Sequence, residues 1–185
     1  LFTELGKYHN ALNAIQNALK IDKSNAAAWC NLAQVQGLLD ETEEAIRSAQ
    51  TALSIKPDYP SALNVLGAAL LVNGLEKDAY EDFERALALD PSLVEAKLNL
   101  SKIYFLEEDY SKSFDLYEFR WATKDFENVW RKDSKEIWKG QKTGSVLLWA
   151  EQGLGDEVMF ASIFNDVAQV CDKVIVECDE RLIRL

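Results

Sequence analysis

The chain has little of what most metal and nucleophile sites require. Its 185 residues include one histidine and three cysteines. His9 by itself cannot form a histidine metal cluster or complete a Ser/His/Asp set, so we expect no metal site and no hydrolase. The cysteines, Cys30, Cys171 and Cys178, form no CxxC pair and are odd in number. That pattern suits a reducing cytosol better than a disulfide framework.

Long apolar runs and an excess of basic charge are absent as well. No run approaches the ~20 apolar residues that span a bilayer, and no signal peptide is visible. We therefore expect no membrane contact and a cytoplasmic location. The formal net charge is −11, and residues 1–117 carry 10 Lys and Arg against 18 Asp and Glu. An acidic surface repels phosphate, so nucleic acid is not an expected partner, and nothing in the chain indicates a cofactor.

What the sequence has in abundance is a period of 34 residues. Small and large apolar residues both keep the step, at Ala11, Ala45 and Ala79, at Ala18, Ala52 and Ala86, and at Leu32, Leu66 and Leu100. Ser113 continues the first series, and Pro57 and Pro91 are also 34 residues apart. This is the period of the tetratricopeptide repeat, in which each unit is a pair of short antiparallel helices.

The pattern predicts a mainly α protein, a right-handed solenoid over residues 1–123 with one partial and three complete repeats. Small residues are expected where the paired helices come closest, and Gly6 and Gly74 are expected in the tight turn inside a repeat. Beyond Phe119 the spacing fails. We expect helices at 8–21, 26–39, 42–55, 60–73, 76–89, 94–107 and 110–123.

The resemblance to this family implies a binding groove, because the first helix of each pair lines the concave face. The implied groove residues are Asn31, Gln34, Asn64, Ala68, Leu71, Asn99, Lys102 and Phe105. Asparagine offers both a donor and an acceptor and can hold an extended peptide backbone. The alternative is that these asparagines are solvated polar groups on an unused face.

Two known groove types can be compared with these residues. Asn31 and Asn99 resemble the asparagine ladder of the O-linked N-acetylglucosamine transferase superhelix, and Val65 interrupts that ladder. The carboxylate clamp of chaperone-binding members needs lysine and arginine in the groove. Only Lys102 is present, so capture of a C-terminal carboxylate is not expected.

The remainder of the chain changes character. Residues 124–143 are rich in charge and are expected to form a connector whose tryptophans, Trp130 and Trp138, pack onto another surface. Residues 144–185 predict the start of an α/β domain, with strands at 145–150 and 173–178 around a helix at 156–169. That helix is expected to bury its apolar residues Phe160, Ile163, Phe164 and Val167. The three elements would form one Rossmann-like β-α-β unit.

A glycine-containing turn separates the first strand from the helix. Gln152, Gly153, Leu154 and Gly155 are candidates for a ligand- or anion-binding turn, because helix N-termini favour anions. The alternative is a tight connection in which Asp156 only caps the helix.

Three motifs in order resemble a family of bacterial tetratricopeptide proteins that continue into a glycosyltransferase-like domain of the GT-B type. They are 117–121 (Tyr-Glu-Phe-Arg-Trp), 138–140 (Trp-Lys-Gly) and 149–156 (Trp-Ala-Glu-Gln-Gly-Leu-Gly-Asp). Related heptosyltransferases carry a similar Leu-Gly-Asp turn in the acceptor cleft. The resemblance alone therefore implies Asp156 as a catalytic base.

Two functions remain open at this point. The first is a repeat scaffold that binds a protein or peptide in its groove. The alternative is the acceptor-selecting part of a glycosyltransferase whose donor-binding half is missing here, in which case this chain by itself is expected to be inactive. The two strands and their helix cannot bury their own apolar surfaces, so we also expect self-association through residues 145–185.

Overall fold

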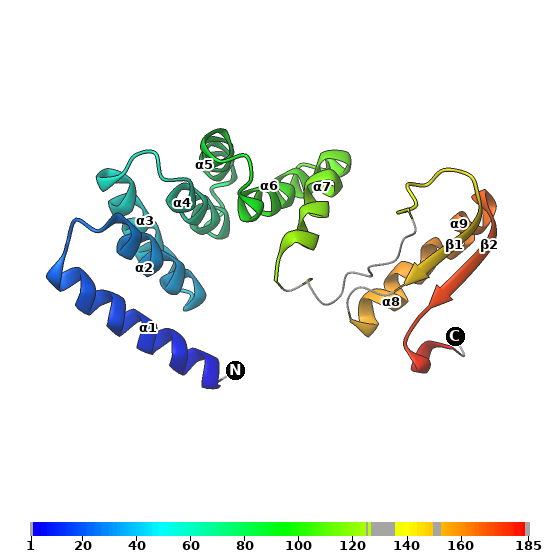
Figure 1. Cartoon of the computed structure of the whole chain (residues 1–185), viewed down its shortest axis with the longest axis horizontal. Coiled ribbons are helices and arrows are strands. Elements are labelled where there is room, and N and C mark those ends of the chain that lie inside the picture. Colours follow the sequence, from blue (N-terminus) through cyan, green and yellow to red (C-terminus); the bar gives the residue numbers. More distant parts are fainter. Residues whose placement is uncertain (1, 125, 127–135, 150–152, 184–185) are drawn as a thin grey trace. The chain divides into compact units, whose positions relative to one another are not determined.

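A computed structural model describes residues 2–124, 126, 136–149 and 153–183 (Figure 1). The chain divides into two compact units, Leu1–Glu127 and Asn128–Leu185, and each is described by itself. Within the described residues, no helix combines the length and the apolar character needed to cross a bilayer.

The first unit is a helical array that runs from blue to green in Figure 1. Its helices are α1 (Phe2–Ile21), α2 (Ala26–Leu38), α3 (Thr42–Ile55), α4 (Pro60–Val72), α5 (Glu76–Leu89), α6 (Val94–Leu106) and α7 (Tyr110–Tyr117). Consecutive helices pack on one another throughout the array. The predicted solenoid of paired helices is confirmed, and the bounds of α2 to α6 agree with the predicted ones to within one residue.

The two ends of the array differ from the prediction. Gly6 lies inside α1, so the turn expected there is wrong. A glycine inside a helix weakens it by only about 1 kcal/mol and does not force it to end. At the other end, α7 stops at Tyr117 and a short 3₁₀ helix, Glu118–Ala122, follows it. Arg120 takes the place of the repeated alanine there and is buried.

The turn inside each repeat has one geometry. Asp40, Gly74 and Glu108 occupy equivalent positions and have φ values of 61°, 73° and 62°. In the second complete repeat, the amide of Leu75 donates to the carbonyl of Leu70 at 3.0 Å, and Gly74 donates to Leu71 at 3.1 Å. This pair of hydrogen bonds is the Schellman motif, which ends a helix with a left-handed residue. The turn expected at Gly74 is therefore confirmed.

Small residues lie at the helix contacts, as predicted. Ala45, Ala52, Ala79 and Ala86 are all at most 1% exposed. Ser113, which takes the place of alanine in this repeat, is buried as well. Its hydroxyl donates to the carbonyl of Ser101 at 2.9 Å, so the added hydroxyl group has a hydrogen-bond partner. In α1 the pattern is weaker. Ala11 is half-buried and Ala18 is exposed.

A glycine and a phenylalanine fit together in the second complete repeat. Gly67 of α4 faces the ring of Phe83 of α5, which is fully buried. A Cβ atom added at Gly67 would lie 2.7 Å from Cε1 of that ring. The equivalent pair in the preceding repeat is Ala33 with Ala49, so the second complete repeat has a smaller residue on its first helix and a much larger one on its second helix. Complementary sizes thus keep the two helices close.

The second unit holds a parallel pair of strands, β1 (Thr143–Trp149) and β2 (Cys171–Glu177), with Leu147 opposite Ile175. Both predicted strands are confirmed, each beginning and ending slightly earlier than expected. Buried Val146, Val167 and Cys171 form its apolar cluster, onto which Trp138 packs. Trp130 lies outside the described residues. Two described strands establish a small parallel sheet and not a Rossmann-like fold.

The helix between the strands does not have the predicted form. It is divided into α8 (Leu154–Phe160), a 3₁₀ turn (Ala161–Ile163) and α9 (Phe164–Val170). Val167 is buried and Phe164 is half-buried, but Phe160 and Ile163 are 55% and 43% exposed, so the expectation that all four are buried is wrong. A 3₁₀ stretch has 3.0 residues per turn, which shifts the apolar residues before it out of phase with those after it.

We predict that Gly67→Ala lowers the free energy of unfolding by about 1–2 kcal/mol, because crowding against Phe83 exceeds the gain in helix propensity. Gly37→Ala is the matched control, since a Cβ atom there meets nothing within 4 Å. It should stabilise α2 by up to about 1 kcal/mol. Urea unfolding measures both, and a Gly67→Ala variant as stable as Gly37→Ala would contradict the packing.

A second background isolates the contact. Replacing Phe83 with leucine removes the ring that the new methyl group would meet. The Gly67→Ala change should therefore cost less in a Phe83→Leu protein than in the original chain.

Candidate functional site

The first helices of the three complete repeats, α2, α4 and α6, carry all the predicted groove residues. Contacts join α2 to α4 and α4 to α6, so the three helices follow one another along the array (Figure 1). We call the surface formed by their predicted groove residues the groove face. Helices α2 and α4 contain no charged residue, and the cations of α6 are Lys97 and Lys102. The Lys97 amine lies 3.7 Å from the centre of the Phe119 ring, where it holds the 3₁₀ helix against α6.

Three of the predicted residues are joined by hydrogen bonds. The amide nitrogen of Asn99 donates to Oδ1 of Asn64 across the α4–α6 contact, at 3.0 Å. The Lys102 amine donates to Oδ1 of Asn99, also at 3.0 Å. Asn64 is 9% exposed and Asn99 is half-buried, so the chain of bonds runs from the helix contact out to solvent. It fixes the orientation of the Asn99 amide on the groove face.

The asparagine that bonds to Asn99 is not at the position that the 34-residue period suggests. Val65, at the equivalent position between Asn31 and Asn99, is 8% exposed and packs in the core. Asn64, one residue earlier, supplies the amide instead. Asn64 and Asn99 are 35 residues apart, so a comparison of residues at 34-residue steps does not pair them.

The other predicted groove residues divide into two groups. Asn31 and Gln34 are exposed on α2. Ala68 and Leu71 are half-buried because they pack against the cluster around Phe83 and Leu100, so they contribute to the core as well as to the surface.

Phe105 is the largest exposed apolar side chain among the predicted groove residues. It is 53% exposed, and its ring lies edge-on to Tyr110 with 5.5 Å between the ring centres. Such an aromatic ring, held on one side and open on the other, is suited to anchor an apolar group of a partner.

Three exposed residues were missed by the sequence reasoning. Leu38, Val72 and Leu106 are the last residues of α2, α4 and α6 and are 57%, 77% and 62% exposed. Their 34-residue spacing was visible in the sequence, but a regular apolar position is ordinarily attributed to the core.

Cys30 also lies on α2, but its thiol is poorly suited to act as a nucleophile or a metal ligand at neutral pH. It is 1% exposed, and burial raises the pKa of its thiol. A protonated, enclosed thiol is neither a good nucleophile nor a metal ligand. Among the residues that the structure describes, no group of three or more His, Cys, Asp or Glu side chains is arranged to hold a metal ion.

The predicted turn of the second unit is described only in part. Gln152 and the side chains of Leu154 and Asp156 lie outside the described residues. Helix α8 begins at Leu154, so Asp156 is in its first turn and the expected capping position is wrong. A Cβ atom at Gly155 would meet nothing within 4 Å, so no close approach of neighbouring atoms requires this glycine.

Two family models match the first half of the chain. A model described as "TPR repeat" matches residues 1–40, and one described as "Tetratricopeptide repeat" matches residues 39–93. The chain is a tetratricopeptide-repeat protein. The repeats over residues 94–122 continue the same helical pairing in the structure.

Curated relatives include RNA polymerase II-associated protein 3 of Xenopus laevis, which is 34% identical over 113 residues, 61% of this chain and 17% of that protein. Protein FlbA of Caulobacter vibrioides is 25% identical over 171 residues, 90% of this chain and 29% of that protein. The FlbA match is long enough to extend into the second unit. The chain spans less than a third of the length of these relatives.

Solved structures of tetratricopeptide repeats show the same fold. TTC0263, a thermophilic TPR protein of Thermus thermophilus, has a TM-score of 0.59 and 22% identity, over 67% of this chain and 70% of that one. The first TPR of Spaghetti (RPAP3), bound to the HSP90 peptide SRMEEVD, has a TM-score of 0.53 and 26% identity, over 58% of this chain and 85% of that one.

We predict that Asn99→Ala lowers the stability of the array by about 1–2 kcal/mol, because the buried Oδ1 of Asn64 loses its donor. Removing both amides, in Asn64→Leu with Asn99→Ala, should cost less than the sum of the two single changes. The matched control is the exposed Asn31→Ala, which should change stability by less than about 0.5 kcal/mol. Strict additivity in urea unfolding would show that the two amides do not interact.

Proposed function

We propose that this tetratricopeptide-repeat protein is a binding scaffold that holds a peptide segment of another protein on its groove face. The observation that carries the proposal is the combination of uncharged helices α2 and α4 with an oriented amide at Asn99 and an exposed ring at Phe105. An uncharged surface is easily desolvated, and a fixed amide can bond to a peptide backbone of any sequence.

Relatives support the class of ligand. The RPAP3 structure holds a peptide, and that domain is 26% identical to this chain over 58% of its length. The second TPR domain of human RPAP3, 30% identical, is likewise solved in complex with the HSP70 peptide SGPTIEEVD. We carry over from these only the use of the repeat array as a peptide receptor.

Binding would rest on a division of roles between two kinds of side chain. Phe105 would bury an apolar side chain of the peptide, and a few such anchors supply most of the affinity of an interface. The amides of Asn31, Asn99 and Gln34 would fix the peptide backbone. Because Asn99 is already held by Asn64 and Lys102, little side-chain entropy is lost when a peptide binds there.

A matched pair of phenylalanines tests the proposal. Phe105 is 53% exposed on α6, and Phe114 is 58% exposed on α7, outside the groove face. Peptides selected from a random library on the full chain would be titrated by calorimetry against Phe105→Ser and Phe114→Ser. We expect about a tenfold loss of affinity for Phe105→Ser, from the lost apolar contact, and less than about twofold for Phe114→Ser.

The reverse order of the two variants would place the binding surface on the second helices of the repeats. A library that yields no peptide for the folded chain would contradict the scaffold itself.

The glycosyltransferase interpretation stays a second proposal. It rests on the three motifs and on the β1–helix–β2 arrangement of the second unit, and none of the relatives described above is named as a glycosyltransferase. In that proposal Asp156 is the base. Because the donor-binding half is missing here, the proposal predicts no sugar transfer from a nucleotide sugar by this chain alone. It predicts transfer that Asp156→Asn abolishes in a protein that also carries that half. Self-association through residues 145–185 and a cytoplasmic location likewise stay predictions.

A further inference from the structure

An aliphatic stripe borders the groove face. Leu38, Val72 and Leu106 are each the last residue of the first helix of a repeat, 34 residues apart. They are 57%, 77% and 62% exposed. None of the three belongs to an apolar cluster of the described residues. We call them the aliphatic stripe.

The helix ends do not explain the stripe. Each of these helices closes with a Schellman motif, in which the apolar contact, where there is one, joins the residue two before the end to the one three after it. In the middle repeat those residues are Leu70 and Leu75, and Val72 has no part in that contact. The three aliphatic side chains are therefore available to something else.

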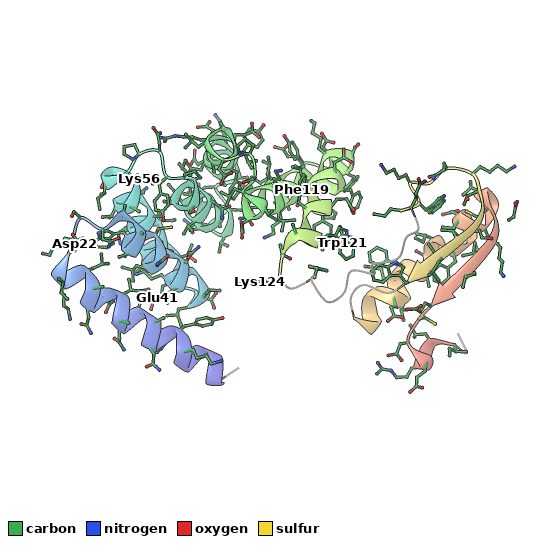
Figure 2. The ribbon with its side chains drawn as sticks, in the orientation of Figure 1. Asp22, Glu41, Lys56, Phe119, Trp121 and Lys124 are labelled. Atoms are coloured by element: carbon green, nitrogen blue, oxygen red, sulfur yellow. The ribbon has the colours of Figure 1, made fainter. Side chains whose placement is uncertain are left out.

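The edge of the array beside the stripe is strongly acidic. The turns that follow the stripe and the first residues of the next helices, 39–44, 73–78 and 107–112, hold nine Asp and Glu against two Lys. The corresponding six-residue segments at the opposite edge, 22–27, 56–61 and 90–95, hold four against two. Figure 2 labels Glu41 and Lys56, which lie at the two ends of α3 and so mark these two edges.

Helix stabilisation accounts for only part of this charge. Glu43, Glu44, Glu76 and Asp78 lie in the first turns of α3 and α5, where acidic side chains favour the helix dipole. Glu41 is the N-cap residue of α3 and is favoured in the same way. Asp40, Glu107 and Glu108 lie directly beyond the C-terminal ends of α2 and α6. A helix C-terminus is negative, so these three carboxylates add to its field and do not neutralise it.

Of the two lysines at this edge, Lys112 is engaged. Its amine lies 2.7 Å from a carboxylate oxygen of Asp109. On the groove face, the Lys102 amine is bonded to Asn99.

We propose that the aliphatic stripe and its acidic edge bind a cationic amphipathic segment of a partner protein; this rests on the proposed function. Apolar side chains of the segment would cover Leu38, Val72 and Leu106, and lysine or arginine beside them would face the carboxylates. Packed helices are about 8–10 Å apart, and two turns of a partner helix rise about 10.8 Å. An apolar residue at every seventh position of a helix therefore matches the stripe.

The same features oppose an acidic tail. The RPAP3 structure holds SRMEEVD, which has two glutamates, an aspartate and one arginine. On the present chain such a peptide would meet carboxylates along the stripe and, on α2 and α4, no cation at all. Like charges placed close together weaken binding, so this chain should prefer a ligand of opposite charge to the peptide bound in the RPAP3 structure.

The first experiment compares two probes on the full chain by fluorescence anisotropy. One is a leucine–lysine peptide of about 14 residues with leucine on one helical face, long enough for two steps of the stripe. The other is SRMEEVD. We expect the leucine–lysine peptide to bind at least about tenfold more tightly, with an advantage that shrinks at high salt because exposed charges are screened. Equal or tighter binding of SRMEEVD overturns the proposal.

Two glutamates at opposite ends of α6 provide a matched charge test. Glu107 directly follows α6 beside the stripe, and Glu95 lies in its first turn. They are separated by about 18 Å of helix, more than two Debye lengths at physiological salt. Glu107→Lys should weaken binding of the leucine–lysine peptide about threefold to tenfold, and Glu95→Lys by less than about twofold. Equal effects of the two variants overturn the assignment of the ligand to this edge.

A triple variant tests the stripe itself. In the stripe variant, serine replaces Leu38, Val72 and Leu106. In the control variant, serine replaces Ile21, Ile55 and Leu89. The control residues end α1, α3 and α5 and are 89%, 38% and 42% exposed. We expect the stripe variant to lose at least about tenfold in affinity for the leucine–lysine peptide and the control to lose less than about threefold. Similar losses contradict the proposal.

Failure of this inference can be told apart from failure of the scaffold. If library-selected peptides bind and Phe105→Ser weakens them, while the leucine–lysine peptide does not bind, only the cationic ligand is wrong. If no peptide of any charge binds the folded chain, both are wrong.

Discussion

The array depends on how closely the two helices of one repeat approach each other. At two of these contacts a small residue allows the approach: Gly67 faces the ring of Phe83, and the hydroxyl of Ser113 donates to the carbonyl of Ser101. In a dense interior, an added methyl group at such a point destabilises the fold. The close pairing fixes the tilt of each repeat, and repetition of that tilt aligns α2, α4 and α6 into one surface.

That alignment produces the surface features on which the proposed function rests. Helices that follow one another at equal intervals bring residues 34 apart into a row, and this produces the aliphatic stripe. Residues 35 apart can meet across the contact between neighbouring first helices, which produces the Asn64–Asn99 hydrogen bond. The acidic edge follows from the same repetition. The turns between the paired helices all lie at the same edge of the array, beside the C-terminal ends of α2, α4 and α6.

The period alone was enough to predict the helices of the array, because the same residue types recur at the same positions in each repeat. It did not predict that α1 extends back through Gly6, since one glycine is a weak local signal against the continuing helix. In the second unit no repeat was available. There the phase of Phe160, Ile163, Phe164 and Val167 suggested one helix, and the 3₁₀ turn that divides it leaves no mark in the apolar spacing.

The sequence assigned the candidate site to the first helices of the repeats, and that assignment stays a prediction. The burial of Val65 and the half-burial of Ala68 and Leu71 depend on side-chain packing against α3 and α5, which the period does not encode. The aliphatic stripe was not predicted, because a regularly spaced apolar residue is ordinarily assigned to the core. Its exposure is known only from the positions of the neighbouring helices. Asp156 was identified by resemblance alone, and its role stays a prediction.

The central claim is that a partner segment lies on the face made by α2, α4 and α6. Methyl NMR of the full chain, labelled at leucine, valine and isoleucine and saturated with a library-selected peptide, tests this most directly. The account predicts that the methyl signals of Leu38, Leu71, Val72 and Leu106 shift while those of Ile21, Ile55 and Leu89 stay in place. Shifts confined to the second group would place the partner on the other helices of the repeats and contradict the account.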